Sequence, residues 1–215
     1  MEERFAELFG QKSVKKRLNF YLDAFKKTST CPFLFLIGAK GLGKTEFARQ
    51  FGQHLENADG KRRPFLELNC STIKNVEQFF DQVFIPLIMD NEITVLFDEA
   101  HELPKDLTNA FLTVFNTEKG THKNLRWRDG EYPFDFKKQT FLFATTEADK
   151  VWPPLKDRLT VIDFEDYTPK ELGQILESQV DEISFSEKAL VELAKTSRGN
   201  ARSCVMRAKE VELFC

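Results

Sequence analysis

The glycine-rich segment GAKGLGKT, at residues 38–45, has the residue types and the spacing that bind a nucleotide phosphate. Its glycines allow the backbone to curl so that N–H groups point inward, and the start of a following helix adds positive potential. In this pattern Lys44 would reach the β- and γ-phosphates, and the Thr45 hydroxyl would bind Mg²⁺. The predicted phosphate-binding residues are Gly38, Ala39, Lys40, Gly41, Leu42, Gly43, Lys44, Thr45 and Glu46.

The sequence on either side gives this segment the context of a binding site. Residues 33–37 are apolar at every position, as expected of a strand in a parallel sheet that is covered on both faces. The apolar residues Phe47, Phe51 and Leu55 then recur every four positions, which is a helical stripe. A strand, a glycine loop and a helix favour a phosphate site over the alternative, an ordinary glycine-rich turn.

A second candidate group, Asp98 and Glu99, follows the apolar segment ITVLF at 93–97. Ligands of open α/β sheets bind at the carboxyl ends of the strands, which is where these two side chains would lie. Asp98 could hold Mg²⁺, and Glu99 could polarise a water that attacks the γ-phosphate. Alone, the pair could be a solvated acidic strand end. Together with the glycine segment it predicts nucleotide hydrolysis.

The letters DEAH at 98–101 also occur in DEAH-box helicases. Those enzymes need two RecA-like domains of similar size, and the chain after Ala100 is too short to provide a second one. We therefore expect His101 to be a surface or packing residue without a role in the chemistry.

Three further polar residues are candidates on weaker grounds. Thr146 follows the apolar segment FLFAT, where its hydroxyl could orient the water, although a Thr at a strand end is more often structural. Arg158 precedes another predicted strand and could reach a nucleotide on a neighbouring subunit, or be an ordinary surface residue. Arg202 lies near the start of the last predicted helix, where a cation opposes the helix dipole and is better explained by an anionic ligand.

Strands and helices alternate through most of the chain. Strands are predicted at 33–37, 64–69, 94–98, 140–145 and 161–164, and a first helix at 14–26. The pattern predicts an α/β fold of the P-loop NTPase type, a five-stranded parallel sheet with helices on both faces. From Tyr167 the pattern is helical only, with Thr168 and Ser186 as predicted N-caps. We expect a nucleotide-binding part at 1–166 and a small all-α lid at 167–215.

The composition is that of a soluble globular protein: 215 residues, of which 41% are hydrophobic and 30% charged. The 22 Phe residues are expected to lie mostly in the core. No apolar run is long enough for a membrane span, and the start is not a signal peptide, so no membrane partner is expected. Scattered cysteines indicate a reducing cytoplasm rather than a disulfide or zinc framework. A net charge of −3 disfavours general electrostatic DNA binding but allows a local basic patch.

Taken in order, these motifs resemble those of AAA+ ATPases, and within that superfamily the RuvB family of Holliday-junction branch migration motors. The likeness covers nearly the whole chain and runs through FAELFGQKSVKKRLNFYLDAFKK, FLIGAKGLGKTEFARQ, VLFDEAHELPKDLTNAFLTVF, FLFATTEADKVWPPLKDRL and SRGNARSCVMRAKE. The resemblance implies ATP and Mg²⁺ as cofactors, and Lys44, Thr45, Asp98 and Glu99 in the roles given above.

The resemblance also implies roles for residues that their own context leaves open. Thr146 would be the sensor 1 residue and Arg202 the sensor 2 residue. Arg158 would be an arginine finger that acts on the ATP of a neighbouring subunit, so the working form would be a ring, commonly a hexamer. The segment Phe9, Gly10 and Gln11 would border the adenine.

At 120–138 the RuvB-like pattern implies a β-hairpin that meets a protein partner. Asp129-Gly130 is a turn signal that suits a hairpin. Arg126, Trp127 and Arg128 form an aromatic and basic cluster that could contact a protein or DNA, or could belong to a solvated hairpin with one anchored Trp.

RuvB-type proteins continue into a winged-helix domain that contacts DNA, which this sequence, ending at Cys215, lacks. We expect an ATP-hydrolysing ring motor that acts on DNA in recombination or replication. The alternative is a clamp-loader-like or regulatory subunit whose ATP state controls a protein partner.

Overall fold

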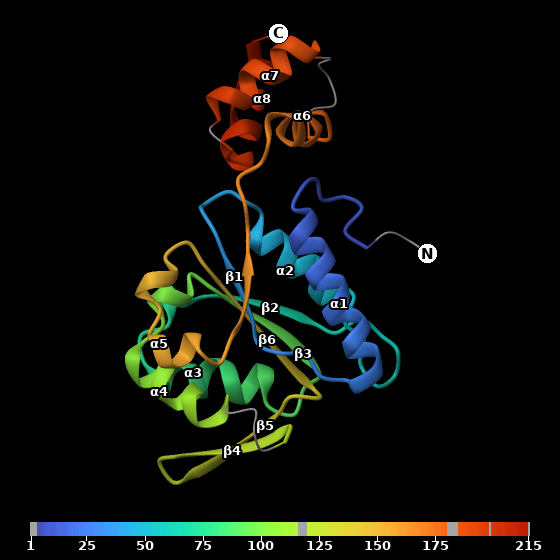
Figure 1. Ribbon diagram of the computed structural model, residues 1–215. Coiled ribbons are helices and arrows are strands. Elements are labelled where there is room, and N and C mark those ends of the chain that lie inside the picture. The colour runs from blue at the N-terminus through green and yellow to red at the C-terminus, as the bar shows by residue number, and fades with distance from the viewer. Residues whose placement is uncertain (1–3, 116–119, 180–184, 198, 215) are drawn as a thin grey trace.

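Five parallel strands form the central sheet of the computed structural model (Figure 1), which describes residues 4–115, 120–179, 185–197 and 199–214. Their order across the sheet is β2-β3-β6-β1-β7. The strands are β1 (Leu34–Ile37), β2 (Phe65–Asn69), β3 (Ile93–Asp98), β6 (Gln139–Thr145) and β7 (Thr160–Asp163). The predicted five-stranded sheet is confirmed, and each end of each strand lies within one residue of its predicted position.

The register of the sheet brings the candidate residues to one edge. Ile37, the last residue of β1, pairs with Thr145 at the end of β6, and Asn69 at the end of β2 pairs with Asp98 at the end of β3. All these pairings are parallel, so the loops that follow the strands leave from the same edge. The glycine segment, Glu99 and Thr146 therefore start from neighbouring positions.

Helices cover both faces of the sheet because its strands are apolar on both faces. α1 (Lys12–Thr28) and α2 (Lys44–Gln53) pack on one face. The other face carries α3 (Val76–Phe79), the π-helix η2 (Phe80–Ile88), α4 (Lys105–Val114) and α5 (Pro153–Lys156). No helix in the described part of the chain is long and apolar enough to cross a membrane.

Most of the abundant Phe side chains lie in the core of the second face. Phe97 and Phe143, on adjacent strands, stack with ring centroids 5.1 Å apart, and Phe111 of α4 meets Phe97 edge-on at 5.3 Å. Offset stacks and edge-to-face contacts of this kind add to the stabilisation by area burial. The expectation that Phe forms core is confirmed for this face.

In the described part of the chain, three helices follow the sheet: α6 (Pro169–Glu177), α7 (Glu187–Thr196) and α8 (Ala201–Phe214). Figure 1 shows them grouped together beyond the edge at which α2 begins. The predicted N-caps are confirmed: Thr168 and Glu171 form a reciprocal capping box, and the Ser186 hydroxyl accepts the N–H of Ala189 at 3.3 Å. Each cap satisfies a backbone N–H at the start of its helix.

The predicted hairpin at 120–138 is also confirmed, with strands β4 (His122–Trp127) and β5 (Gly130–Asp135). Its turn differs from the expectation by one residue, because Gly130 already pairs with Trp127 and the two-residue loop is Arg128-Asp129. Arg128 has a left-handed φ of 51° and its guanidinium pairs with Glu77. In Figure 1 the hairpin lies at the opposite end of the molecule from α6–α8.

Candidate nucleotide-binding site

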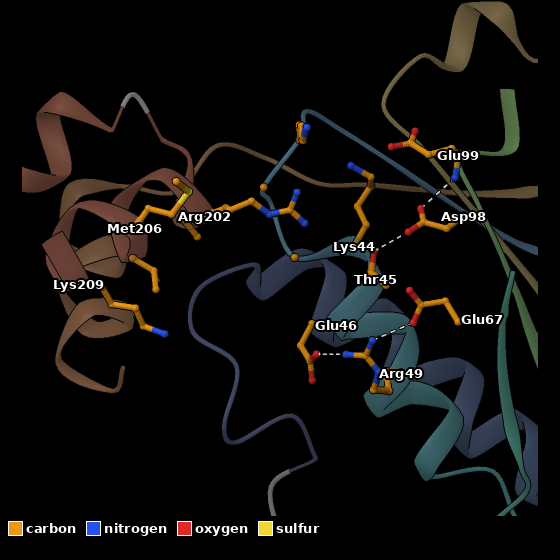
Figure 2. A pocket seen from close by; sticks show the side chains of 15 residues that line it. Lys44, Thr45, Glu46, Arg49, Glu67, Asp98, Glu99, Arg202, Met206 and Lys209 are labelled. Carbon is orange, nitrogen blue, oxygen red and sulfur yellow. Dashed lines mark hydrogen bonds and ion pairs between the residues drawn. The ribbon is translucent and has the colours of Figure 1, made fainter. Parts of the chain in front are cut away.

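A pocket of about 580 Å³ lies where the glycine loop, the ends of β2 and β3, and α8 meet (Figure 2). Its lining comes from segments that are far apart in the sequence. The lining residues are Lys40, Gly41, Gly43, Lys44, Thr45, Glu46, Arg49, Glu67, Asp98, Glu99, Ala201, Arg202, Val205, Met206 and Lys209. The structure thus brings most of the predicted phosphate-binding residues together with Asp98, Glu99 and Arg202.

The glycine loop needs its glycines for two separate reasons. Gly43, at the start of α2, has a left-handed φ of 86°, a conformation that few residues with a Cβ adopt. Gly41 has a φ of 83°, and a Cβ there would lie 2.2 Å from the side-chain oxygen of Asn200. The loop is therefore fixed both by its own backbone and by close approach of the segment that precedes α8.

The Lys44 ammonium is held beneath this loop. Its Nζ donates to the carbonyl oxygens of Gly38 at 2.8 Å and Ala39 at 2.9 Å, and an ammonium has a third donor. Burial lowers the pKa of Lys44, and the charge of Arg202 lowers it further, while Asp98 and Glu99 raise it. The positive charges of Lys44 and Arg202 repel each other across the pocket. A polyanion such as a triphosphate would reduce this repulsion, so the pair favours a polyanionic ligand.

The residues predicted for Mg²⁺ are in direct contact. The Thr45 hydroxyl donates to Asp98 Oδ2 at 3.0 Å, and Asp98 Oδ1 accepts the N–H of Glu99 at 3.0 Å (Figure 2). Among the described residues no group of three or more His, Cys, Asp or Glu could hold a metal ion by itself. One hydroxyl and one carboxylate fit Mg²⁺ because this ion takes few protein ligands and completes its shell with phosphate oxygens and water.

Glu99 lies one residue beyond β3 in a left-handed conformation, with a φ of 52°. Such a φ is uncommon outside glycine, and non-glycine residues held in that region cluster at functional sites. Its Oε2 is 3.5 Å from the Thr146 hydroxyl. Thr146 lines a second cavity together with Gly38 and does not line the nucleotide pocket. Its link to that pocket is its contact with Glu99, which lines it.

His101 was expected to be a surface or packing residue without a chemical role; its ring is buried rather than at the surface, and the absence of a chemical role stays a prediction. Its side chain is only 7% exposed, and its Nδ1 lies 2.8 Å from the Thr145 hydroxyl and 3.6 Å from Glu99 Oε2. As is usual for a buried imidazole, both ring nitrogens have polar neighbours, and Nε2 lies 3.4 Å from Glu102 Oε1 and from Glu147 Oε1.

The C-terminal helices contact the loop through residues that the sequence did not single out. The Asn200 amide donates to the Lys40 carbonyl at 2.6 Å, and the Tyr167 hydroxyl donates to the Leu42 carbonyl at 3.0 Å. Burial raises the pKa of Tyr167 to about 12, so its hydroxyl remains a donor at neutral pH. Arg202, two residues after Asn200, points from α8 toward Lys44 in Figure 2. The GNAR motif was read for its arginine alone, although its asparagine is the residue that touches the loop.

Comparison with known protein families supports the geometry. The model of the family described as "ATPase family associated with various cellular activities (AAA)" matches residues 34–167, which is more than half of the chain and includes every strand of the sheet. The chain belongs to the AAA family. Its phosphate-binding loop, Asp98 and Glu99 all fall within the matched residues.

Two curated relatives of this AAA protein are both named "Holliday junction branch migration complex subunit RuvB". The one from a Nitratiruptor species is 27% identical, and the one from Lactobacillus helveticus is 28% identical, each over 97% of this chain. The chain spans only 61% and 59% of their lengths. A solved structure of the Thermotoga maritima RuvB Holliday junction branch migration motor has a TM-score of 0.78 at 23% identity, covering 98% of this chain and 64% of that one, and so shows a shared fold.

The predicted site residues Gly38, Ala39, Leu42 and Thr146 do not line this pocket, and two further groups of predicted residues lie away from it as well. Gly10 lies against Tyr167 and Glu171, and the Gln11 amide bonds the backbone of Glu165 from both its nitrogen and its oxygen. The segment formed by Phe9, Gly10 and Gln11 therefore borders the start of the C-terminal helices, and its contact with adenine stays a prediction. Arg158 donates from Nη1 to the Pro154 carbonyl at 2.7 Å and is absent from the lining of the pocket in its own chain.

Proposed function

We propose that this AAA protein binds ATP with Mg²⁺ and hydrolyses it. The observation that carries the proposal is the meeting of two pairs at one edge of the sheet. Thr45 and Asp98, 3.0 Å apart, are the oxygen ligands that a nucleotide-bound Mg²⁺ needs. Glu99 and Thr146, 3.5 Å apart, are the carboxylate and hydroxyl that a water needs beside the γ-phosphate.

In this scheme each side chain has a task that follows from its position. Lys44 binds the β- and γ-phosphates from beneath the loop, and Arg202 binds the phosphates from the side of α8. Glu99 orients the attacking water and takes its proton, with Thr146 holding the far side of that water. When bound, Mg²⁺ supplies charge compensation between the β- and γ-phosphates. Catalysis is then mostly positioning and electrostatics, which requires the groups to be held before ATP arrives.

The proposal includes a ring in which Arg158 completes the site of a neighbouring subunit. Its absence from the pocket of its own chain supports this assignment. We propose that residues 1–166 form the nucleotide-binding part and 167–215 the lid, and that the ring, commonly a hexamer among RuvB-like proteins, acts on DNA in the manner of a branch migration motor. The likeness to proteins named as Holliday junction branch migration subunits supports DNA as the substrate.

A protein partner at the hairpin is also proposed. One side of the hairpin is used for anchoring, because Phe134 stacks on Phe84 of η2 at 4.3 Å and Leu125 is buried. Neighbours along a strand face opposite sides, so Asn124 and Arg126, which are exposed, lie on the outer side. A polar outer side with one cation favours a hydrogen-bonding partner over an apolar one.

A second function, an ATP-controlled switch without motor activity, has one observation in its favour. Asn200 and Tyr167 tie the C-terminal helices to loop carbonyls that flank Gly41. A phosphate that reshapes this loop would change both hydrogen bonds, so nucleotide binding would move the helices whether or not DNA is pulled. A switch of this kind could control a protein partner directly.

The experiment is an ATPase assay on the purified chain with Mg²⁺ or EDTA, in the presence of a four-way DNA junction, linear duplex or no DNA. Hydrolysis that needs Mg²⁺ and rises several-fold with junction DNA supports the motor. The switch is supported if the rate of hydrolysis is the same with and without either DNA and if ATP protects residues 167–177 from hydrogen exchange. No hydrolysis under any condition overturns the proposed function.

A further inference from the structure

The ring of His101 lies between the end of β3 and the end of β6. It belongs to the short helix η3 (Ala100–Glu102), and its Nδ1 is 2.8 Å from Thr145 Oγ1. On the other side of the ring, Nε2 lies 3.4 Å from Glu102 Oε1 and 3.4 Å from Glu147 Oε1. The two elements that carry Glu99 and Thr146 are therefore joined by one buried side chain.

The hydrogen bonds around Thr145 assign the protons of this ring. Thr145 is fully buried, and its Oγ1 accepts the N–H of Glu147 at 3.0 Å. A buried hydroxyl also needs an acceptor for its own proton, and Nδ1 of His101 is within reach. Nδ1 then accepts, and Nε2 carries the ring proton toward Glu102 and Glu147. Both ring nitrogens are thereby oriented.

The carboxylate that this ring adjoins is otherwise weakly held. The Glu99 side chain is 38% exposed, and its Oε2 lies 3.5 Å from the Thr146 hydroxyl and 3.6 Å from His101 Nδ1. A hydrogen bond of 3.5 Å is long, so Thr146 alone fixes the carboxylate poorly. With Nδ1 as an acceptor, the ring limits the position of this oxygen by its bulk and forms no hydrogen bond to it.

We infer that His101 is a positioning residue for ATP hydrolysis, which holds the Glu99 carboxylate in register with Thr146 by locking η3 to the end of β6. The inference rests on the proposed function, since it assigns a role within that reaction. The ring touches neither the nucleotide pocket nor any predicted metal ligand, so its effect passes through Glu99 and Thr145. Thr145 and Glu147 flank Thr146, so a shift of Thr146 would reach the ring from both sides.

Electrostatics maintains this arrangement. Glu147 accepts a hydrogen bond from Lys150, which lowers the pKa of Glu147 and keeps it ionised beside the ring. An ionised Glu147 favours the ring orientation in which Nε2–H faces it. Nδ1 is then directed to Thr145, next to Glu99.

The test compares His101→Ala, His101→Asn and Thr145→Val in the full chain. An Asn amide oxygen can take the place of Nδ1 and accept from the Thr145 hydroxyl, whereas Ala removes the contact, and Val replaces the Thr hydroxyl at similar volume. We expect kcat to fall about 10- to 100-fold in His101→Ala and Thr145→Val, with KM for ATP and the Kd of a non-hydrolysable ATP analogue changed less than about threefold. His101→Asn should regain most of the loss.

A double variant separates coupling from coincidence. If the ring acts through Thr145, the two substitutions remove the same interaction. The kcat of the double variant should then lie within about twofold of the kcat of the slower single variant. His122→Ala is the matched control, because it removes a histidine ring that is 71% exposed on the hairpin, and its kcat should stay within about threefold of wild type.

Three results would overturn the inference while leaving ATP hydrolysis intact. They are an unchanged kcat in His101→Ala and Thr145→Val, a parallel loss of Tm and analogue binding without rescue by Asn, and additive losses in the double variant. If His101→Ala does not fold, Thr145→Val and His101→Asn still decide between these results. Wild-type protein that fails to hydrolyse ATP would instead refute the proposed function itself.

Discussion

The carboxyl edge of the central sheet and its Phe-rich face are built from different kinds of side chain. At the carboxyl edge, polar side chains meet over a backbone with left-handed residues, as at Gly41, Gly43 and Glu99. On the Phe-rich face and toward the hairpin, aromatic rings fill the space, as where Phe84 stacks on Phe134. Holding charged groups close together at the carboxyl edge costs stability. The Phe-rich face offsets that cost because it buries apolar area.

Activity and stability should therefore be separable by position in this chain. Substitutions at the carboxyl edge should change rates or binding with little effect on folding, because few of those side chains are packed in the core. Substitutions in the Phe-rich core should lower the stability while leaving the site intact in the molecules that remain folded. Each of the variants below sharpens or breaks that division.

The largest effect is expected from Arg158→Ala. If this guanidinium stabilises the transition state on a neighbouring subunit, kcat should fall about 10³- to 10⁵-fold, equivalent to about 4–7 kcal/mol. Binding of a non-hydrolysable ATP analogue should change little, since Arg158 does not line the nucleotide pocket of its own chain. Lys156→Ala, on the neighbouring helix α5, is the matched control. A kcat of Arg158→Ala within about tenfold of wild type would remove the residue from the site.

Glu99→Gln should lower kcat about 10²- to 10⁴-fold, because the amide cannot take the proton of the attacking water. The Gln side chain keeps the size and most contacts of Glu, so the Kd for ATP should change less than about threefold. Equilibrium binding with a fluorescent ATP analogue and a phosphate-release assay measure the two quantities. Unchanged turnover would exclude Glu99 as the base and leave Thr146 without its partner.

Phe84→Ala tests the other end of the sheet. Phe84 lies on η2, is fully buried and stacks on Phe134 of the hairpin. Replacing it with Ala should lower the free energy of unfolding by about 3–5 kcal/mol. Denaturant unfolding measures this change, and Leu87→Ala, 44% exposed on the same helix, should change it by less than about 0.5 kcal/mol. The Kd for ATP at a temperature where the variant is folded should stay near wild type. A large rise in that Kd would contradict the division.

The smallest effect is expected from Thr168→Ala, which removes one half of the capping box of α6. The loss should be about 1 kcal/mol of stability, local to the C-terminal helices. Hydrogen exchange of α6 amides compared with β3 amides measures it, because only α6 should exchange faster. Equal acceleration in β3 would show that the helices and the sheet unfold as one cooperative unit.

The sequence allowed most of the fold to be predicted, for reasons visible in particular residues. Most strands were readable because they contain an apolar run, which in β3 ends at the polar residue Asp98. The order of the strands was not readable, since the pairing of β1 with both β6 and β7 depends on contacts distant in the sequence. The π-helical form of η2 was equally hidden, because a helical period of about 3.6 residues describes its apolar face almost as well.

Prediction of the site succeeded where a motif fixes geometry and failed where the partner lies elsewhere in the chain. The contact of Thr45 with Asp98 follows from a loop and a strand end that share one edge. The bond from Asn200 to the Lys40 carbonyl joins the segment before the last helix to the first loop, and no local pattern indicates it. The polar surroundings of His101 could not be predicted for the same reason, since its partner Thr145 lies on a strand that is adjacent only in space.

The central claim is that ATP is hydrolysed at the boundary between two copies of this chain, with Glu99 from one and Arg158 from the other. The direct measurement is the ATPase rate of a mixture of Glu99→Gln and Arg158→Ala proteins, each nearly inactive alone. Mixed assemblies contain sites with an intact Glu99 facing an intact Arg158, so we predict that activity returns on mixing. It should reach a maximum near equal amounts, a substantial fraction of the wild-type rate. Activity that stays at the sum of the two separate variants at every ratio and concentration would contradict the account.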